Sequence, residues 1–146
     1  MSLHETILAD LTTAMKARDA ETLGVLRLMK AALLNAEKDG GPASMLSDEQ
    51  VIDVLQKEAK KRKDSIEAFT AGDRGDLAET EKAELAIIER YLPAPFTDDE
   101  VRAMIAAVIQ ATDAPNFGAV MGKVMQEVGG RADGKKVKEL IQEQLS

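Results

Sequence analysis

The sequence predicts an all-α protein, because its apolar residues recur every three or four positions and helix breakers divide it into short segments. Apolar residues make up 45% of the 146 residues, yet only three Phe and one Tyr are aromatic and no Trp is present. The core must therefore be aliphatic. With 31% charged residues as well, this composition is typical of amphipathic helices that pack along one face.

Four helices are expected in an N-terminal domain of residues 1–92, arranged as a bundle. The first has an apolar stripe at helical spacing, formed by Leu3, Ile7, Leu8, Leu11 and Met15. The second, over about residues 23–36, is apolar on a broad face and is expected to be well buried. Gly40, Gly41 and Pro42 are expected to end it.

The third helix is expected over residues 48–71. Ser47 is placed to act as its N-cap, and Gln50 stands in the capping-box position. The apolar stripe of this helix is interrupted at Arg62. The aliphatic stem of that side chain is expected to lie along the core, with its head at the rim or paired with an acid.

A turn at residues 72–75 precedes a fourth helix, expected over residues 76–91. The glutamates in this segment are Glu79, Glu81, Glu84 and Glu89. Paired carboxylates could indicate acid–base chemistry, but no His or Cys accompanies them and Lys82 is interleaved. A solvated helix surface is therefore the favoured interpretation.

Residues 93–96 are expected to form a proline-rich hinge, because Pro93 and Pro95 cannot continue a helix and restrict the residues before them. Residues 97–146 then form a C-terminal tail domain of three short helices. Their predicted N-caps are Thr97, Asn116 and Asp133. Gly129 and Gly130 are expected to end the middle helix, since helix C-termini commonly need a residue with positive φ.

Composition and charge exclude several classes of function. The net charge of −7 opposes non-specific nucleic-acid binding, and the absence of Cys excludes disulfides and thiolate chemistry. No secretory signal and no apolar run of about 18 residues is visible, so a cytoplasmic protein without a membrane partner is expected. The single histidine, His4, is expected to be an exposed terminal residue. No cofactor and no metal site is expected.

The C-terminal domain carries the candidate binding residues. Half of the ten glycines lie there: Gly118, Gly122, Gly129, Gly130 and Gly134. Basic residues are threaded among them: Lys123, Arg131, Lys135, Lys136 and Lys138. Residues 115–140 contain five basic and only three acidic residues, although the whole chain is acidic. Because glycine in a helix costs about 1 kcal/mol relative to alanine, a ligand or another backbone is expected to approach these positions closely.

Each of these features also has a plain structural explanation. Gly118 and Gly122 share one helix face, which suits either close approach of RNA or tight packing against a neighbouring helix. The helix that starts after Asp133 offers free N–H groups to phosphate, but Asp133 is itself an anion and accepts one of them. RNA contact and simple capping with solvated lysines are both open at this helix start.

A second basic surface lies on the third predicted helix. It consists of Lys57, Lys60, Lys61 and Lys63. Together with Arg62, the consecutive basic residues at positions 60–63 cover all sides of a helix rather than one stripe. A solvated face is the favoured interpretation, and a docking surface for RNA or protein is the alternative.

Several short motifs follow one another in the order typical of a known family. They are KKRKDSIEAF at residues 60–69, GDRGDL at 72–77, KAEL at 82–85, YLP at 91–93, NFGAVMGKVM at 116–125 and GGRADGKKV at 129–137. Together they resemble the YqeY-like family over about residues 3–145. The segment 96–146 also resembles the tail domain of the B subunit of aspartyl/glutamyl-tRNA amidotransferase, in which Asn-Pro commonly stands where Asp133-Gly134 stands here.

The resemblance implies a small helical tail that touches tRNA. It also implies that catalysis lies elsewhere, because glutamine hydrolysis and tRNA activation belong to other parts of the amidotransferase, and no phosphate-binding loop or nucleophile elbow is present. The expected function is a non-catalytic accessory module that contacts tRNA or a tRNA-associated enzyme, such as an amidotransferase subunit. A protein–protein adaptor without RNA binding is one alternative. A glutamine-dependent carbon–nitrogen ligase activity that requires partner subunits is the other.

Overall fold

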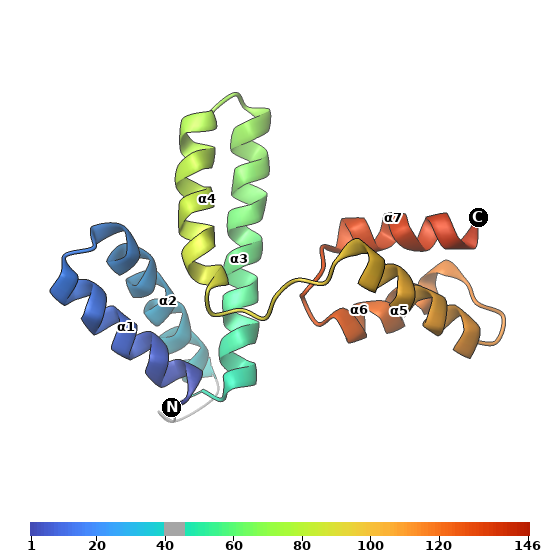
Figure 1. The fold of residues 1–146 in the computed structure, drawn as a ribbon, viewed down its shortest axis with the longest axis horizontal. Coiled ribbons are helices and arrows are strands. Elements are labelled where there is room, and N and C mark those ends of the chain that lie inside the picture. The colour runs from blue at the N-terminus through green and yellow to red at the C-terminus, as the bar shows by residue number, and fades with distance from the viewer. Residues whose placement is uncertain (40–45) are drawn as a thin grey trace. The chain divides into compact units, whose positions relative to one another are not determined.

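The computed structural model describes residues 1–39 and 46–146. Within those ranges the chain forms seven α-helices and no strand, which confirms the all-α prediction (Figure 1). The helices belong to two compact units, Met1–Leu92 and Pro93–Ser146. The expected helix break at residues 40–42 lies outside the described residues.

The N-terminal unit consists of two helical hairpins. Its helices are α1 (Leu3–Ala17), α2 (Ala20–Asp39), α3 (Asp48–Ala71) and α4 (Gly75–Glu89). Figure 1 shows α1 beside α2, and α3 beside α4. The deepest core side chains are Ile7, Leu26, Met29, Leu33, Leu55 and Ile88. The core is thus aliphatic, as the composition predicts.

Local capping fixes where α3 and α1 begin. Ser47 Oγ accepts a hydrogen bond from Gln50 N at 3.2 Å, and Gln50 Oε1 accepts one from Ser47 N at 2.9 Å. This reciprocal pair satisfies two N–H groups that the helix itself leaves unpaired, and it confirms the predicted capping box. Helix α1 begins in the same way, with Ser2 and Glu5, which the sequence analysis did not anticipate.

His4 is buried rather than exposed, which corrects the expectation from the sequence. Its Nδ1 accepts a hydrogen bond from Leu46 N at 3.3 Å, and its Nε2 lies 3.7 Å from Glu37 Oε1. Leu3 N donates to Asp48 Oδ1 at 2.8 Å close by. The start of α1 is therefore tied to the end of α2 and the start of α3. The prediction failed because Leu46 is 42 positions away in the sequence.

The C-terminal unit is a three-helix module with its own core. Its helices are α5 (Asp98–Ala111), α6 (Phe117–Val128) and α7 (Gly134–Leu145). Side chains from all three helices form the core: Val101, Ile105, Val108, Val120, Val124, Val128, Val137, Leu140 and Ile141. The spacing of the three α6 valines, one every four residues, fixes which face of α6 points inward.

The caps of this unit agree with the sequence analysis. Thr97 forms a capping box with Glu100, and the side chains of Asn116 and Asp133 cap α6 and α7. Gly129 ends α6 with φ of 52°, in the left-handed region that glycine enters without a steric penalty. Each helix start was predictable because the capping contact spans only two or three residues.

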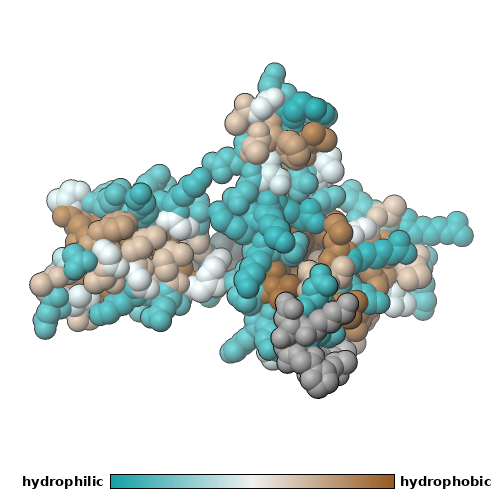
Figure 2. Space-filling model, turned by 180° about the vertical axis from the view of Figure 1, so that it is seen from behind, coloured by the Kyte–Doolittle hydropathy of each residue, from teal (hydrophilic) through white to brown (hydrophobic). Residues whose placement is uncertain are grey.

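On the face that Figure 2 shows, most of the surface is hydrophilic, and apolar residues reach it in patches. In the part of the chain that the structure describes, no helix combines the length and the apolar character needed to cross a membrane. Over the same residues, no group of three or more His, Asp or Glu side chains could hold a metal ion.

Candidate nucleic-acid interface

Helix α6 turns its two interior glycines away from the core. Gly118 and Gly122 are exposed, while Val120 and Val124, each two residues after one of these glycines, are fully buried. A Cβ added at Gly122 meets no atom within 4 Å, and one added at Gly118 meets only Asn116 Oδ1, at 3.5 Å. Tight packing against a neighbouring helix therefore does not explain these glycines within the unit.

Other side chains extend this bare surface. Met125 is half-buried beside Gly122, and its Cε lies 3.8 Å from the Cβ position of Gly134 at the start of α7. We call the surface formed by Gly118, Gly122, Met125 and Gly134 the α6 glycine face. The exposed ring of Phe117 stands at its beginning. Met125 also packs against the core of the C-terminal unit, so only part of its side chain belongs to this face.

The predicted lysines divide between two sides of the unit. Lys135 and Lys138 are exposed on α7. Lys138 is four positions after Gly134 and therefore lies on the same side of α7 as that glycine, whereas Lys135 is the next residue after Gly134 and points about 100° away from it. Lys123 instead points toward the end of α5, where its Nζ lies 3.3 Å from Thr112 Oγ1. The structure thus places Lys138 on the side of Gly134, Lys135 on another side of α7, and Lys123 near the end of α5.

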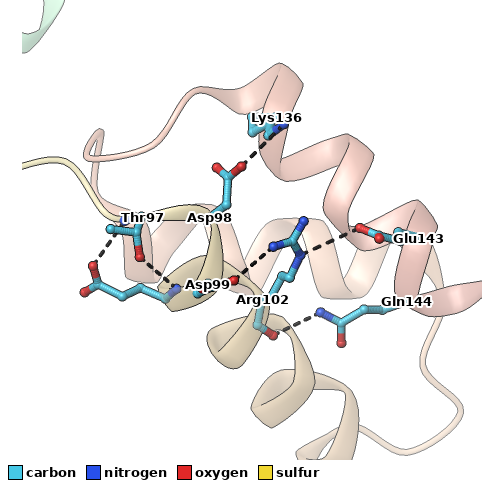
Figure 3. A network of polar contacts seen from close by, with 8 residues as sticks. Thr97, Asp98, Asp99, Arg102, Lys136, Glu143 and Gln144 are labelled. Atoms are coloured by element: carbon cyan, nitrogen blue, oxygen red, sulfur yellow. Dashed lines mark hydrogen bonds and ion pairs between the residues drawn. The ribbon is translucent and has the colours of Figure 1, made fainter.

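Lys136 belongs to a polar network between α5 and α7 (Figure 3). Its Nζ lies 3.5 Å from Asp98 Oδ2. Further along, Arg102 Nε lies 3.8 Å from Glu143 Oε2, and the Arg102 carbonyl accepts a hydrogen bond from Gln144 Nε2 at 3.0 Å. These exposed contacts are individually weak, at most about 1 kcal/mol each, but together they orient α7 on α5.

Arg131 is engaged in packing within its own unit. Its Nε donates to the Ala94 carbonyl at 2.8 Å, and its guanidinium carbon lies 3.9 Å from the centre of the Phe96 ring. The Arg131 carbonyl accepts a hydrogen bond from Phe96 N at 2.8 Å. A cation over an aromatic face contributes about 0.5–1 kcal/mol at such a site. Arg131 therefore ties the loop before α7 to the segment before α5.

The remaining glycines of the tail have a backbone explanation. Gly129 and Gly130 have φ of 52° and 84°, which side-chain-bearing residues rarely adopt. Their role is to stop α6. At the start of α7, Asp133 Oδ1 accepts the hydrogen bond from Lys135 N at 3.3 Å, so one of the donors that phosphate would use is already taken.

On α3, most of the second basic surface is paired with acids of the same helix. Lys57 Nζ lies 3.5 Å from Asp53 Oδ2, and Lys61 Nζ lies 3.3 Å from Glu58 Oε1. Lys60 forms the same kind of pair with Asp64, at 3.1 Å. The fourth lysine, Lys63, is exposed. These short-range pairs fit the interpretation of a solvated helix face.

Arg62 is nearly buried, as the gap in the apolar stripe predicts. Only 12% of its side chain is exposed, and its Nη1 donates to Glu81 Oε2 at 3.2 Å and to Glu84 Oε2 at 2.5 Å. The interpretation of the α4 glutamates as a solvated surface is therefore wrong for these two residues. They are half-buried and link α4 to α3.

A sequence model of YqeY-like proteins matches residues 4–145, nearly the whole chain. The chain belongs to the YqeY-like family. This confirms the resemblance that the motifs indicated.

Two kinds of relative are similar to this YqeY-like chain. It is 31% identical to altered inheritance of mitochondria protein 41 of Pyrenophora tritici-repentis over 140 residues, which cover 92% of this chain and 76% of that protein. The protein of the same name in Candida glabrata is 34% identical over 87 residues, 60% of this chain and 48% of that protein. The E subunit of glutamyl-tRNA(Gln) amidotransferase from Sulfolobus acidocaldarius is 33% identical over 112 residues, 70% of this chain and 17% of that protein.

The expected cytoplasmic location is contradicted by these relatives. The proteins from Pyrenophora tritici-repentis, Candida glabrata and Meyerozyma guilliermondii are all mitochondrial by name. The lack of a visible secretory signal does not separate the cytoplasm from an organelle that proteins reach by another route, which is why this expectation failed.

Proposed function

We propose that the C-terminal unit is an accessory module that contacts tRNA, or an enzyme that handles tRNA, through the α6 glycine face and the adjoining Lys135 and Lys138. The observation that carries this proposal is the open space at Gly122. A glycine inside a helix costs about 1 kcal/mol relative to alanine, and no contact within the unit requires it. A surface that binds the backbone of another molecule at close range would require glycine at this position.

The chemistry of the face suits a sugar–phosphate backbone. Exposed main chain at Gly118 and Gly122 permits close approach, and Lys135 and Lys138 supply positive charge at the edge. Since the whole chain carries a net charge of −7, which opposes broad electrostatic attraction, the proposed recognition relies on a few local contacts and on shape. The similarity to one component of a tRNA-dependent amidotransferase supports tRNA as the ligand.

The proposed role is binding, and any amidotransferase chemistry would come from partner subunits. Association with an amidotransferase is part of the same proposal. A carbon–nitrogen ligase activity of the isolated chain is not proposed.

The test is fluorescence-anisotropy binding of the purified protein to bulk deacylated tRNA at several salt concentrations. The Gly122→Ala variant is expected to be more stable than the wild type, because nothing obstructs the new Cβ, and yet to bind tRNA several-fold more weakly. Gly75→Ala is the matched control, since that helical glycine also has open space but lies in the other unit. It should leave binding unchanged.

Charge is tested separately with the double variant Lys135→Ala/Lys138→Ala. A plot of log affinity against log salt concentration has a negative slope whose magnitude grows with the number of phosphate contacts. Loss of two contacts should make this plot less steep, reducing the magnitude of the slope by about two. Lys57→Ala/Lys61→Ala, which removes the same charge from α3, should not change the slope. Equal affinity in all four variants would contradict the proposed surface. No binding at low salt would contradict direct tRNA contact and leave the tRNA-associated enzyme as the partner to test.

A further inference from the structure

Phe117, the first residue of α6, presents an aromatic ring at the surface of the C-terminal unit. It is 36% exposed, and in this unit, which the structure describes in full, it is the one large apolar residue exposed to that degree. The other aromatic residue of the unit, Phe96, is half-buried, and the guanidinium carbon of Arg131 lies 3.9 Å from its ring centre. Of the two rings, that of Phe117 is the one open to a ligand.

Asn116, directly before this ring, carries two hydrogen-bond donors that the fold does not use. Its Oδ1 accepts a hydrogen bond from Ala119 N at 3.0 Å, and this cap fixes which end of the amide faces the helix. No residue that the structure describes accepts a hydrogen bond from Asn116 Nδ2. Gly118 is exposed on the other side of the ring in sequence and adds no side chain. A ring, an oriented pair of donors and bare main chain therefore occur in three consecutive residues.

The charge of this segment indicates which part of a nucleotide it suits. Residues 114–122 contain no charged side chain, and the residue before them, Asp113, is an exposed acid. The Nζ of Lys123, which follows them, lies 3.3 Å from Thr112 Oγ1. A phosphate at Phe117 would gain no local cation and would be repelled by Asp113. An uncharged base instead can stack on an aromatic ring and accept hydrogen bonds at its edge.

The burial of the neighbouring side chains distinguishes a base from a helix of a protein partner. Recognition of an apolar helix commonly uses several anchors at three- and four-residue spacing. On α6, however, Met121 and Met125, which follow Phe117 at that spacing, are half-buried and pack against the core of the unit. One exposed ring matches one flat ligand better than it matches a long apolar stripe.

We infer that Phe117 stacks on the exposed face of one nucleobase of the bound RNA, and that Asn116 Nδ2 donates a hydrogen bond to the edge of the same base. This inference rests on the tRNA contact proposed above and names two further residues that make it. The stack itself tolerates any base, because every base has a π face. A preference among bases would come from the amide of Asn116, which can only donate to acceptor atoms through Nδ2.

The first experiment compares full-length variants at position 117 by fluorescence anisotropy with bulk deacylated tRNA. Phe117→Leu keeps an apolar side chain but removes the π face, so the Kd should rise about tenfold. Phe117→Tyr and Phe117→Trp keep an aromatic ring and should bind as tightly as the wild type. Because no phosphate contact is lost, Phe117→Leu should leave the slope of log affinity against log salt concentration unchanged.

The role of the amide is tested with Asn116→Ser. Serine caps a helix about as well as asparagine but lacks the amide donors, so the Kd should rise several-fold while thermal stability stays the same. Thr97→Ser exchanges the cap of α5 in the same unit and is the matched control. It should change neither the Kd nor the stability.

Phe117→Trp also reports the stack directly, because the chain has no tryptophan of its own. Addition of tRNA should quench its fluorescence, with the same Kd as the anisotropy titration. Phe69→Trp, at a half-buried aromatic position of α3, is the matched control, and its fluorescence should not respond. Circular dichroism verifies that each variant is folded.

The outcomes separate this inference from the proposed tRNA contact. If the wild type binds tRNA and Phe117→Leu binds equally well, the stack is wrong and the tRNA contact stands. The same holds if tRNA leaves the fluorescence of Phe117→Trp unchanged. An equal loss of affinity in Phe117→Leu and Phe117→Tyr would show that the shape of the side chain decides, not stacking. Absence of tRNA binding by the wild type at low salt would contradict both ideas and assign the ring to a protein ligand.

Discussion

Single polar side chains connect helices that are distant in the sequence of the N-terminal unit. His4 joins α1 to Leu46, Tyr91 joins the end of α4 to Asp10 of α1, and Arg62 joins α3 to α4. A polar group removed from water stabilises the fold only if it finds a partner, and an unpaired one costs about 1–3 kcal/mol. These residues therefore help to select one arrangement of aliphatic helices that could otherwise pack in several registers.

Tyr91 gives a prediction at alkaline pH. Its hydroxyl donates to Asp10 Oδ2 at 2.6 Å. Burial, together with the bond to Asp10 and the negative charge of that carboxylate, raises the pKa of Tyr91 above the usual 10.0. Because the folded state favours the neutral phenol, this contribution to stability is complete below pH 10 and is lost as the pH rises through the folded pKa.

The measurement is simple because the chain has one tyrosine and no tryptophan. Ultraviolet absorbance of the phenolate should therefore report Tyr91 alone, and its midpoint should lie above that of free tyrosine. Asp10→Asn, which keeps an acceptor but removes the charge, should move the midpoint back toward 10.0. A wild-type midpoint at or below the free value would show that the buried bond does not persist in solution.

His4 gives a prediction of stability. His4→Ala leaves the Leu46 N–H without its acceptor in a buried place and removes a packed ring, so we expect a loss of about 2 kcal/mol in the free energy of unfolding. Urea denaturation followed by circular dichroism measures it. His4→Asn retains a nearby acceptor and should recover part of the loss. Equal stability of His4→Ala and wild type would mean that the imidazole bond contributes nothing.

At the scale of helices, the polar contact between α3 and α4 depends on one charged group, the Arg62 guanidinium. Arg62 faces both Glu81 and Glu84, whose side chains are 24% and 27% exposed. Among the described residues, Arg62 Nε is the one buried side-chain nitrogen or oxygen that lacks a hydrogen-bond partner. Removing the cation leaves two half-buried carboxylates facing each other, whereas replacing the whole triad with neutral groups leaves no unpaired charge.

We therefore expect Arg62→Ala to cost about 2 kcal/mol of unfolding free energy, less than a fully buried pair would, because solvent reaches the glutamates. The triple variant Arg62→Met/Glu81→Gln/Glu84→Gln should be close to wild type in the same urea experiment. If the triple variant is as unstable as Arg62→Ala, the loss arises from packing of the arginine stem and not from the charges.

Helix positions could be predicted, and long-range pairing could not. The starts at Ser47, Thr97 and Asn116 depend on contacts with residues three positions away, which are visible in the sequence. The partner of His4 is 42 positions away, and Arg131 reaches back 37 positions to the Ala94 carbonyl. The same limit applies to the candidate site. Sequence indicated the glycines and lysines, but only the fold separates those along the α6 glycine face from those that point toward α5.

At the scale of the whole molecule, two aliphatic cores have no residue in common. One cluster lies within residues 1–92, and the other lies within residues 93–146. A core substitution removes buried contacts from its own cluster, so its cost should fall on the helices that share that cluster. Substitutions on α6 that test the proposed tRNA contact should therefore leave the core of the N-terminal unit intact.

This leads to a prediction about local stability. Val124→Ala should destabilise the C-terminal unit by about 2 kcal/mol and accelerate amide hydrogen exchange in α5, α6 and α7, while exchange in α1–α4 stays at the wild-type rate. Leu55→Ala should destabilise the N-terminal unit and accelerate exchange in α1–α4, while exchange in α5, α6 and α7 stays at the wild-type rate. Hydrogen exchange measured by mass spectrometry resolves the two regions. If Val124→Ala also accelerates exchange in α1–α4, the two cores unfold as one cooperative structure, and binding defects of tail variants would then have to be separated from their effects on the N-terminal helices.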